Sequence, residues 1–360
     1  MKILFLVTGI GLGHSIREHS IIKSIVKKMP DVQIKVIGFK NSYDYFKKHG
    51  YDVEKIRGYS FSGEKLKIDK TKLFFLNLGY PFRFLFNLFR VGKIAFRFNP
   101  DIIVCDAQPE GIVVGKLLRK KVVLVYNLYM GDKVKGSFSN LAVMLKNLFY
   151  PLIHKIINPS LLNVRRTEGN VELIPPIVRD KLIELPVEAV LMKKLGLKKR
   201  PIIVQIGGSK FGGKLVDNLV EVSKDFPDEK FLVFGSKKKK TSNVSFLPFK
   251  SNFLEYLKVG KVVITLAGHE ILSEIIHFRK ASLVFPIAYV EQMENARVMR
   301  KNKLAVVGSH HQNQPDELKL LIEKVLERKG EIEKRILDLG VRENGADVAA
   351  KLILGIKHTS

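Results

Sequence analysis

The feature that most constrains the fold is a unit of strand, glycine-rich loop and helix that occurs twice along the chain. Near the start, the apolar residues 3–7 are followed by Gly9, Gly11 and Gly13 and then by a helical apolar pattern. A short run of branched apolar residues is typical of a strand buried on both faces, as in parallel sheets. The same order begins again at residues 202–206. The sequence therefore predicts an α/β protein with two similar, doubly wound parallel sheets.

The length of the chain agrees with two domains. At 360 residues, and with roughly 150 residues in a domain, two cores are expected. Breaks in the alternation predict an amino-terminal domain at 1–170 and a second domain at 201–340. Between them, residues 171–200 are rich in proline and lysine and are expected to connect the domains. A terminal helix is expected within 341–360, with the first domain as its packing partner.

Composition indicates a globular protein of a reducing compartment. The chain is 46% apolar and 27% charged and has one cysteine, Cys105, in an apolar run, where we expect it to be a small buried hydrophobe. The short apolar start lacks a cleavage site, so we expect a cytoplasmic protein. The formal charge of +27 favours anionic partners, namely nucleic acid, acidic lipid or phosphorylated metabolites. A general habit of the source organism would explain the charge equally well.

A histidine stands at the end of the first glycine loop. His14 lies where the first strand turns into a helix, and open α/β sheets bind ligands at the carboxyl ends of their strands. Ser15 and Glu18 have the spacing of a capping box at that helix start. Asp106 ends a later apolar run, 101–106, which is expected to be another strand of this sheet. The alternative is that His14 merely caps the helix or bonds to the loop.

The second half carries a glycine loop at 207–213 and, further on, polar residues at two strand ends. A glycine loop before a helix is an anion site, because its N–H groups and the helix dipole favour negative charge. Gly268 and His269 follow a strand, and Glu274 lies on the helix after it. A carboxylate there suits the diol of a ribose, since it only accepts hydrogen bonds. Acidic residues also favour the first turn of a helix for reasons unrelated to function.

Several motifs in a fixed order resemble the GT-B glycosyltransferases. They read G-x-G-x-G-H-x-x-R near the start, G-G-S in the second loop, G-x(5)-E at Gly268 to Glu274, and E-Q-x-x-N at Glu291 to Asn295. The pattern is similar to lipid II-forming N-acetylglucosaminyltransferases, plant galactolipid synthases and UDP-glycosyltransferases, and to a group of microbial glycosyltransferases. This resemblance implies the GT-B fold, two Rossmann-like domains that face each other across a cleft.

The resemblance also implies a role for each motif residue. The residues assigned to the nucleotide sugar are Gly11, Gly13, Gly208 and Ser209 at the diphosphate, Gly268 and His269 at phosphate, Phe249 at the uracil edge, Glu274 at the ribose, and Glu291, Gln292 and Asn295 at the donor sugar. His14 would be the general base that takes a proton from the acceptor hydroxyl, and Asp106 would orient it. Arg17 and Lys210 are further candidates for phosphate contact.

The chain departs from the family pattern at Leu266. A histidine that contacts phosphate in many UDP-glycosyltransferases stands two residues before the glycine, and here that residue is Leu266. Retaining enzymes carry a second glutamate eight positions before the one that matches Glu274, which is again Leu266. We therefore expect an inverting enzyme. The chain has no D-x-D motif, so we expect no metal and no cofactor beyond the donor, with helix dipoles and basic groups stabilising the leaving diphosphate.

Two segments of the first half suggest the nature of the acceptor. Residues 71–98 interleave phenylalanines with basic residues and contain no acid, and residues 144–155 are similar in kind. Such helices suit the surface of an anionic membrane, whereas the alternative is that they pack into the core. No apolar run approaches twenty residues. The corresponding hypothesis is a hydroxyl acceptor that is lipid-linked, used by an enzyme bound peripherally at the inner face of the cell membrane.

Two other functions remain open from the sequence. A nucleotide-sugar 2-epimerase shares the fold, although the histidine loop and the aromatic insertion look suited to an acceptor. A basic nucleic-acid-binding protein would explain the charge, but the chain has none of the common recognition motifs, and nucleic acid is disfavoured as a partner.

Overall fold

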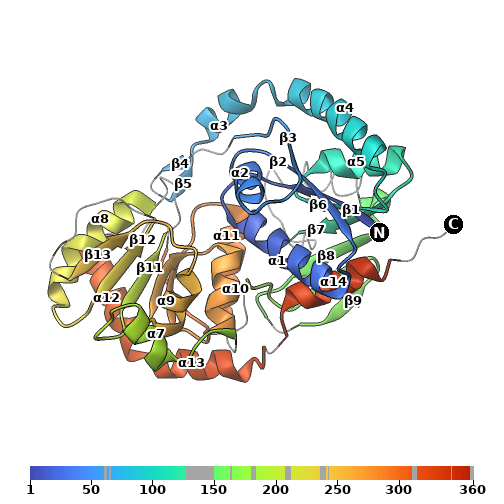
Figure 1. Ribbon diagram of the computed structural model, residues 1–360. Helices are drawn as coiled ribbons and strands as arrows, with labels where there is room; N and C mark the ends of the chain where they lie inside the picture. The colour runs from blue at the N-terminus through green and yellow to red at the C-terminus, as the bar shows by residue number, and fades with distance from the viewer. Residues whose placement is uncertain are drawn as a thin grey trace. The chain divides into compact units, whose positions relative to one another are not determined.

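The computed structural model describes the chain at residues 1–60, 63–64, 66–126, 150–162, 164–179, 184–206, 212–235, 241, 243–309, 314–341 and 343–356. The chain divides into two compact units (Figure 1). The first comprises Met1–Phe61, Phe74–Arg179 and Glu343–Ser360, and the second comprises Ser62–Leu73 and Asp180–Arg342. The 144–155 segment lies outside the described residues up to residue 149.

The first unit is built on an eight-stranded sheet with the order β3-β2-β1-β6-β7-β8-β10-β9. All neighbouring strands are parallel except β9, which pairs with β10 antiparallel. The strands are β1 (Lys2–Val7), β2 (Gln33–Gly38), β3 (Val53–Lys55), β6 (Ile102–Asp106), β7 (Lys121–Val125), β8 (Lys155–Pro159), β9 (Arg166–Glu168) and β10 (Val171–Ile174).

Helices cover both faces of this sheet, because alternate residues of its buried strands point to opposite sides. Phe5 of β1 packs in a core formed with α1 and α14, whereas its neighbour Leu6 packs in the core under α4 and α5. The helices are α1 (Gly13–Lys28), α2 (Asn41–Lys48), α4 (Tyr80–Phe98), α5 (Pro109–Leu117) and α14 (Gly345–Leu354), with a 3-10 turn, η1 (Tyr150–Leu152). Helix α3 (Lys70–Asn77) spans the division between the units.

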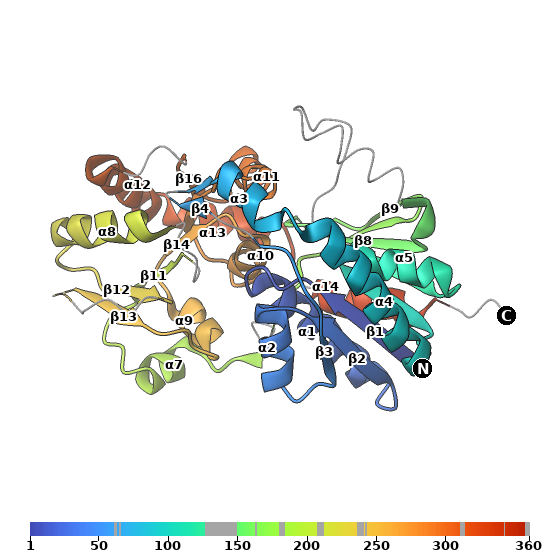
Figure 2. The same cartoon turned by 90° about the horizontal axis from the view of Figure 1, so that it is seen from above.

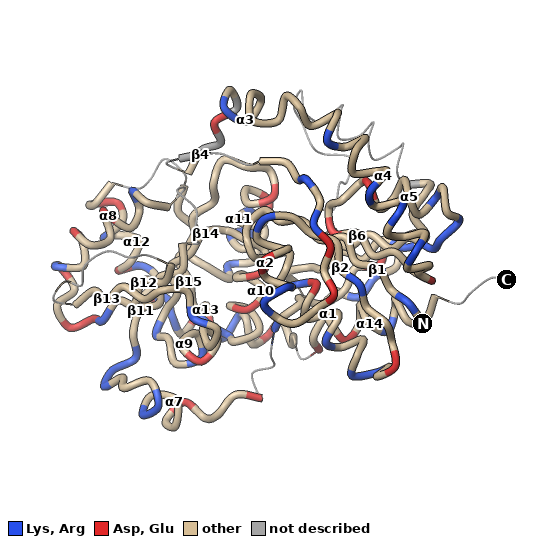
Figure 3. The backbone as a smooth tube through the Cα atoms, turned by 45° about the horizontal axis from the view of Figure 1, so that its top comes forward, with Lys and Arg blue, Asp and Glu red and all other residues tan. Residues whose placement is uncertain are grey.

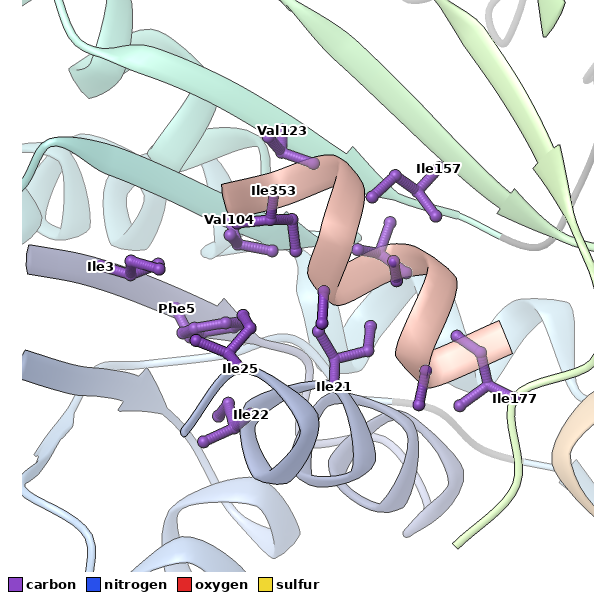
Figure 4. Packing of buried hydrophobic residues seen from close by; sticks show 14 of the residues in the cluster. Ile3, Phe5, Ile21, Ile22, Ile25, Val104, Val123, Ile157, Ile177 and Ile353 are labelled. Carbon is purple, nitrogen blue, oxygen red and sulfur yellow. The ribbon is translucent and has the colours of Figure 1, made fainter. Parts of the chain in front are cut away.

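The last helix, α14, packs on the first unit. Its Ile353 lies in the same buried cluster as Ile21 and Ile25 of α1 and Val104 of β6 (Figure 4). The Asn344 Oδ1 atom caps the helix by accepting from the Ala346 N–H at 2.9 Å, and the same side chain bonds with the backbone N–H and oxygen of Val178. The terminal helix is thus fixed by both apolar burial and backbone hydrogen bonds.

The second unit repeats the architecture with a six-stranded parallel sheet of order β13-β12-β11-β14-β15-β16 and a separate hairpin, β4-β5. Its strands are β4 (Gly63–Glu64), β5 (Lys67–Ile68), β11 (Ile202–Gln205), β12 (Phe231–Phe234), β13 (Val244–Leu247), β14 (Val263–Leu266), β15 (Ser282–Phe285) and β16 (Val306–Val307). Its helices are α7 (Glu188–Lys194), α8 (Gly213–Val222), the 3-10 turn η4 (Ser223–Asp225), α9 (Phe253–Val259), α10 (His269–His277), α11 (Val290–Lys301), α12 (Pro315–Glu327) and α13 (Lys329–Asp338).

The prediction of two doubly wound parallel sheets is confirmed, and Cys105 is fully buried as expected. The stretch 171–200, expected as a connection, contains strand β10 of the first sheet and helix α7 of the second unit. Its prolines, Pro175 and Pro176, follow β10 directly, so they end a strand of the sheet.

Candidate functional site

The first sheet has a topological switch point between β1 and β6. Strands β2 and β3 lie on one side of this pair and β7 and β8 on the other, so the chain leaves β1 and β6 in opposite directions. Open α/β sheets bind their ligands at the carboxyl ends of such a strand pair. The glycine loop follows β1 there. Gly11 has a φ of +70°, and a Cβ on Gly9 would lie 1.7 Å from the backbone oxygen of Phe39. Both positions therefore require glycine.

His14 and Asp106 meet at this switch point. His14 is the second residue of α1, and Asp106 is the last residue of β6. The His14 Nδ1 atom lies 2.8 Å from the Asp106 Oδ1 atom, with the His14 side chain 22% exposed and that of Asp106 fully buried. The Arg17 Nη2 atom donates to the same Asp106 oxygen at 2.7 Å and lies 3.1 Å from His14 Nδ1. The structure thus brings together the two residues that the sequence assigned to catalysis, and it adds Arg17.

The charges of this cluster follow from its burial and from the contacts among its members. Burial alone would raise the pKa of Asp106, but the Arg17 guanidinium and the His14 ring outweigh it and lower that pKa to about 2. An ionised carboxylate only accepts hydrogen bonds, so we assign the His14 proton to Nδ1, the ring nitrogen that faces the Asp106 oxygen. The ring nitrogen with the lone pair is then Nε2, which is the arrangement of a general base oriented by a carboxylate.

Glu18 is a fourth member of the cluster. It is fully buried, and its Oε1 atom lies 3.6 Å from the Arg17 Nε atom. Burial, and next the negative charge of Asp106, raise the pKa of Glu18 well above its ordinary value of 4.5. One guanidinium cannot compensate two buried carboxylates, so Glu18 is the member of the pair that keeps its proton to higher pH.

This protonation predicts how stability changes with pH. The folded protein keeps a proton on Glu18 that the unfolded chain releases above about pH 4.5, so wild-type stability falls as pH rises from there toward the raised pKa. Glu18→Gln mimics the protonated acid and removes this dependence. We expect the stability of the variant relative to wild type to rise between pH 5 and pH 8, as measured by urea unfolding. A constant difference would show that Glu18 is ionised in the fold.

Two expectations about this helix are wrong. The sequence predicted a capping box from Ser15 and Glu18, but α1 begins earlier, at Gly13, and its cap residue Leu12 makes no side-chain capping bond. Arg17, considered for phosphate, is 1% exposed and bonds to Asp106. The spacing of His14 and Arg17, three residues apart on a helix, was the signal that could have paired them.

The second sheet has its own switch point between β11 and β14. The Thr265 hydroxyl of β14 donates to the backbone oxygen of Gln205 at 2.7 Å and ties the two strand ends together. Gly268 is the cap residue of α10, which begins at His269. The first N–H groups of a helix have no partner within it and favour an anion. The start of α10 therefore lies at the carboxyl edge of the sheet, where open parallel sheets bind ligands.

The predicted donor residues of α10 and α11 lie beside this point. Glu274 is on α10 and 4% exposed. The Asn295 side chain is buried and donates to the backbone oxygen of Ala267 at 2.9 Å, just before Gly268. The Gln292 Oε1 atom accepts from the N–H of Ile287 at 3.1 Å. Asn295 therefore holds the loop before Gly268 in place.

The other residues predicted to bind the donor are not brought together at this switch point by any recorded contact between described residues. Glu291 is in the first turn of α11. Burial raises the pKa of Tyr289, two residues earlier, and the negative charge of Glu291 raises it further. Phe249 follows β13 and is 52% exposed. Strand β13 is separated from β11 by β12, so Phe249 lies two strands from the switch point. Gly208, Ser209 and Lys210 lie outside the described residues.

The β4-β5 hairpin adds a contact that the sequence did not predict. Although it comes from the first part of the chain, it groups with the second unit, and the backbone oxygen of Leu66 accepts from the N–H of Ala288 at 2.7 Å. This bond holds the hairpin against the loop that leads into α11. No group of three or more possible metal ligands occurs within the described part of the chain.

Comparison with known proteins places this geometry in a family. The sequence model described as glycosyl transferase family 1 matches residues 1–325. An uncharacterised glycosyltransferase of Methanopyrus kandleri is 26% identical over 288 residues, which cover 76% of this chain and 81% of the relative. A UDP-N-acetylglucosamine–N-acetylmuramyl-(pentapeptide) pyrophosphoryl-undecaprenol N-acetylglucosamine transferase of Thermoanaerobacter sp. is 25% identical over 322 residues, or 84% of each chain.

A solved structure shows the same fold. The glycotransferase of kitacinnamycin superimposes with a TM-score of 0.72 and 15% identity, covering 98% of each chain. At this identity the likeness concerns the fold alone, which is GT-B, as the sequence resemblance predicts.

Proposed function

The chain belongs to glycosyl transferase family 1 and is a glycosyltransferase, and from this premise we propose an inverting, metal-independent transfer of a sugar from a UDP-sugar to a hydroxyl acceptor. The observation that carries the proposal is the His14–Asp106 pair at the switch point of the first sheet, with 2.8 Å between Nδ1 and Oδ1. Family membership favours transfer over the epimerase and nucleic-acid alternatives.

The first unit supplies the base. His14 Nε2 takes the proton of the acceptor hydroxyl as its oxygen attacks the anomeric carbon, and the bond from that carbon to the diphosphate breaks on the opposite side. A single displacement of this kind inverts the anomeric configuration. Asp106, ionised and buried, holds the ring in the required tautomer and stabilises the imidazolium that forms.

The second unit holds the donor. The N–H groups at the start of α10 and the glycine loop that contains Gly208 and Ser209 are proposed to bind the diphosphate, with no metal required for the leaving group. Glu274 is proposed to accept both ribose hydroxyls. Glu291 and Gln292 are proposed to contact the donor sugar.

The acceptor is proposed to be lipid-linked and the enzyme to work at the cytoplasmic face of a membrane. One relative transfers to a pyrophosphoryl-undecaprenol acceptor according to its name. The aromatic and basic residues of 71–98 support the same assignment for this chain. No helix in the described ranges has the length and apolar character that a bilayer crossing requires.

A thermal-shift experiment with nucleotides tests the donor site. We expect UDP to raise the melting temperature more than dTDP, GDP or ADP. Glu274→Gln keeps the side-chain volume but removes a charged acceptor, which should weaken UDP binding by about 10- to 100-fold. Glu323→Gln, on the exposed face of α12, is the matched control and should bind UDP as wild type does. Unchanged UDP binding by Glu274→Gln would place the ribose elsewhere.

A further inference from the structure

Helix α4 presents its aromatic residues to solvent. Of the large apolar side chains that are exposed in the described part of the first unit, nine of eleven lie between residues 74 and 96. Phe82, Phe89 and Phe96 of α4 are 79%, 82% and 76% exposed. Their spacing of seven residues places them on one side of the helix. An ordinary surface helix shows the reverse arrangement, with its apolar side on the core.

The opposite side of α4 explains why this face stays outside. The residues that α4 buries are Asn87, Val91 and Ala95. The Asn87 amide donates to Glu110 of α5 at 3.0 Å and to the backbone oxygen of Arg57 at 2.6 Å. This buried polar network fixes the rotation of the helix about its own axis, so the phenylalanines cannot turn inward without breaking it.

Cations accompany the aromatic residues. Helix α4 carries Arg83, Arg90, Lys93 and Arg97, and the stretch 70–98 contains no acidic residue (Figure 3). Arg90 lies 3.8 Å from Glu54, but neither Lys93 nor Arg97 forms an ion pair with any described residue. An open hollow of about 700 Å³ lies along the carboxyl-terminal part of α4. It is lined by Phe86, Phe89, Arg90, Lys93, Arg97 and Phe98, with Lys35, Glu54 and Ile94. The patch is thus both apolar and positively charged.

The direction of α4 places one end of this face near the catalytic cluster. Helix α4 leads into β6, and the Asp101 N–H bonds to the Lys2 oxygen, so the helix ends at the amino edge of the sheet and starts at the carboxyl edge (Figure 2). At that start, the Tyr80 ring lies 6.0 Å from Tyr59, which lies 5.6 Å from Phe39. Phe39 is the residue that contacts Gly9 in the histidine loop.

From these observations we propose that the exposed face of α4 is the membrane-binding surface, with the helix lying in the plane of an anionic bilayer. Its phenylalanines enter the boundary between head groups and acyl chains, and Lys93 and Arg97 bind lipid phosphate in the hollow. This deepens the proposed function, since a lipid-linked acceptor would then reach the carboxyl edge near His14 along the membrane. Binding itself requires no transfer, so the two proposals can fail separately.

The absence of tryptophan from the chain allows a direct test. Phe89→Trp places one reporter on the α4 face, and Leu320→Trp places one at a 65% exposed position of α12 as the control. With vesicles of phosphatidylcholine and phosphatidylglycerol, we expect the emission of Phe89→Trp to shift to shorter wavelength and to be quenched by brominated acyl chains. The control should not respond. Equal responses, or none, would overturn the proposal.

Charge reversal tests the hollow. Lys93→Glu/Arg97→Glu should weaken binding to the anionic vesicles by at least about 30-fold, because each cation near the surface contributes on the order of a factor of five or more. Lys27→Glu/Lys28→Glu, on exposed positions of α1, changes the net charge equally and should have a much smaller effect. Equal losses would mean that overall charge, and not this face, binds the membrane.

Two further outcomes would also overturn it. An emission shift of Phe89→Trp that grows with protein concentration without lipid would show that the face binds a second copy of the chain, and a shift with oligonucleotides alone would indicate nucleic acid. The UDP-dependent thermal shift is measured on every variant. An α4 variant that still binds UDP but no longer binds vesicles identifies the membrane surface. A wild-type protein that does not bind UDP would count against the proposed donor site alone.

Discussion

His14→Gln is expected to reduce the rate of sugar transfer by a factor of about 100 to 10,000 while leaving UDP affinity unchanged. Glutamine preserves much of the side-chain volume but cannot take the proton of the acceptor hydroxyl. His14 is 22% exposed and lies in the first unit, so its loss should disturb neither the core nor the donor residues of the second unit. Transfer is measured by release of UDP in the presence of acceptor, and affinity by thermal shift.

The control is another histidine of the same unit. His49→Gln removes an exposed ring whose Nδ1 bonds only locally, at 2.7 Å, to the backbone oxygen of Tyr45. It should transfer sugar as wild type does. If His14→Gln also keeps most of its activity, the general base is a different residue and the proposed role of the His14–Asp106 pair is wrong.

Arg17→Met is expected to lower the free energy of unfolding by about 3–5 kcal/mol, because it leaves the fully buried carboxylate of Asp106 without its cation. Methionine is unbranched and fills most of the space of the arginine stem. The uncompensated carboxylate also favours the imidazolium form of His14, so we expect transfer to be lost at a higher pH than in wild type. Urea unfolding followed by circular dichroism measures the first effect, and the acidic limb of the kcat/KM profile measures the second.

The double variant Arg17→Met/Asp106→Asn separates this cause from a simple packing defect. Asparagine removes the buried charge, so the double variant should be more stable than Arg17→Met alone. The double variant should be inactive even at pH values where Arg17→Met still transfers sugar, since a neutral amide does not hold His14 in the required tautomer. Additive losses of stability would show that Arg17 acts by packing and not by compensating Asp106.

The contact between His14 and Asp106 could be anticipated because it depends on topology. His14 follows β1 and Asp106 ends β6, and these two strands flank the switch point. The protonation of Glu18 could not be anticipated, since nothing in the local pattern tells a capping glutamate from a buried one. That distinction depends on Asp106, which lies far along the chain and reaches Glu18 only in the folded unit.

The aromatic segment illustrates a second limit. Its composition predicted a helix that either meets a membrane or packs into the core, and the structure shows that most of its phenylalanines stay outside the core. Burial is set by Asn87 and its bond to Glu110, a polar contact that a hydrophobic pattern assigns to the outside. The β4-β5 hairpin was missed for a related reason, because one backbone hydrogen bond from Leu66 leaves no mark on side-chain periodicity.

The position of α14 has a consequence for biosynthesis. The ribosome delivers the first sheet early, but Ala349, Ala350 and Ile353, which cover part of it, are translated only after the entire second unit. Until then the apolar residues of α1 and β6 that α14 covers are exposed in the nascent amino-terminal half. The first unit can therefore complete its core only after nearly the whole chain has been translated. A chain truncated anywhere before α14 would expose this apolar surface and tend to aggregate.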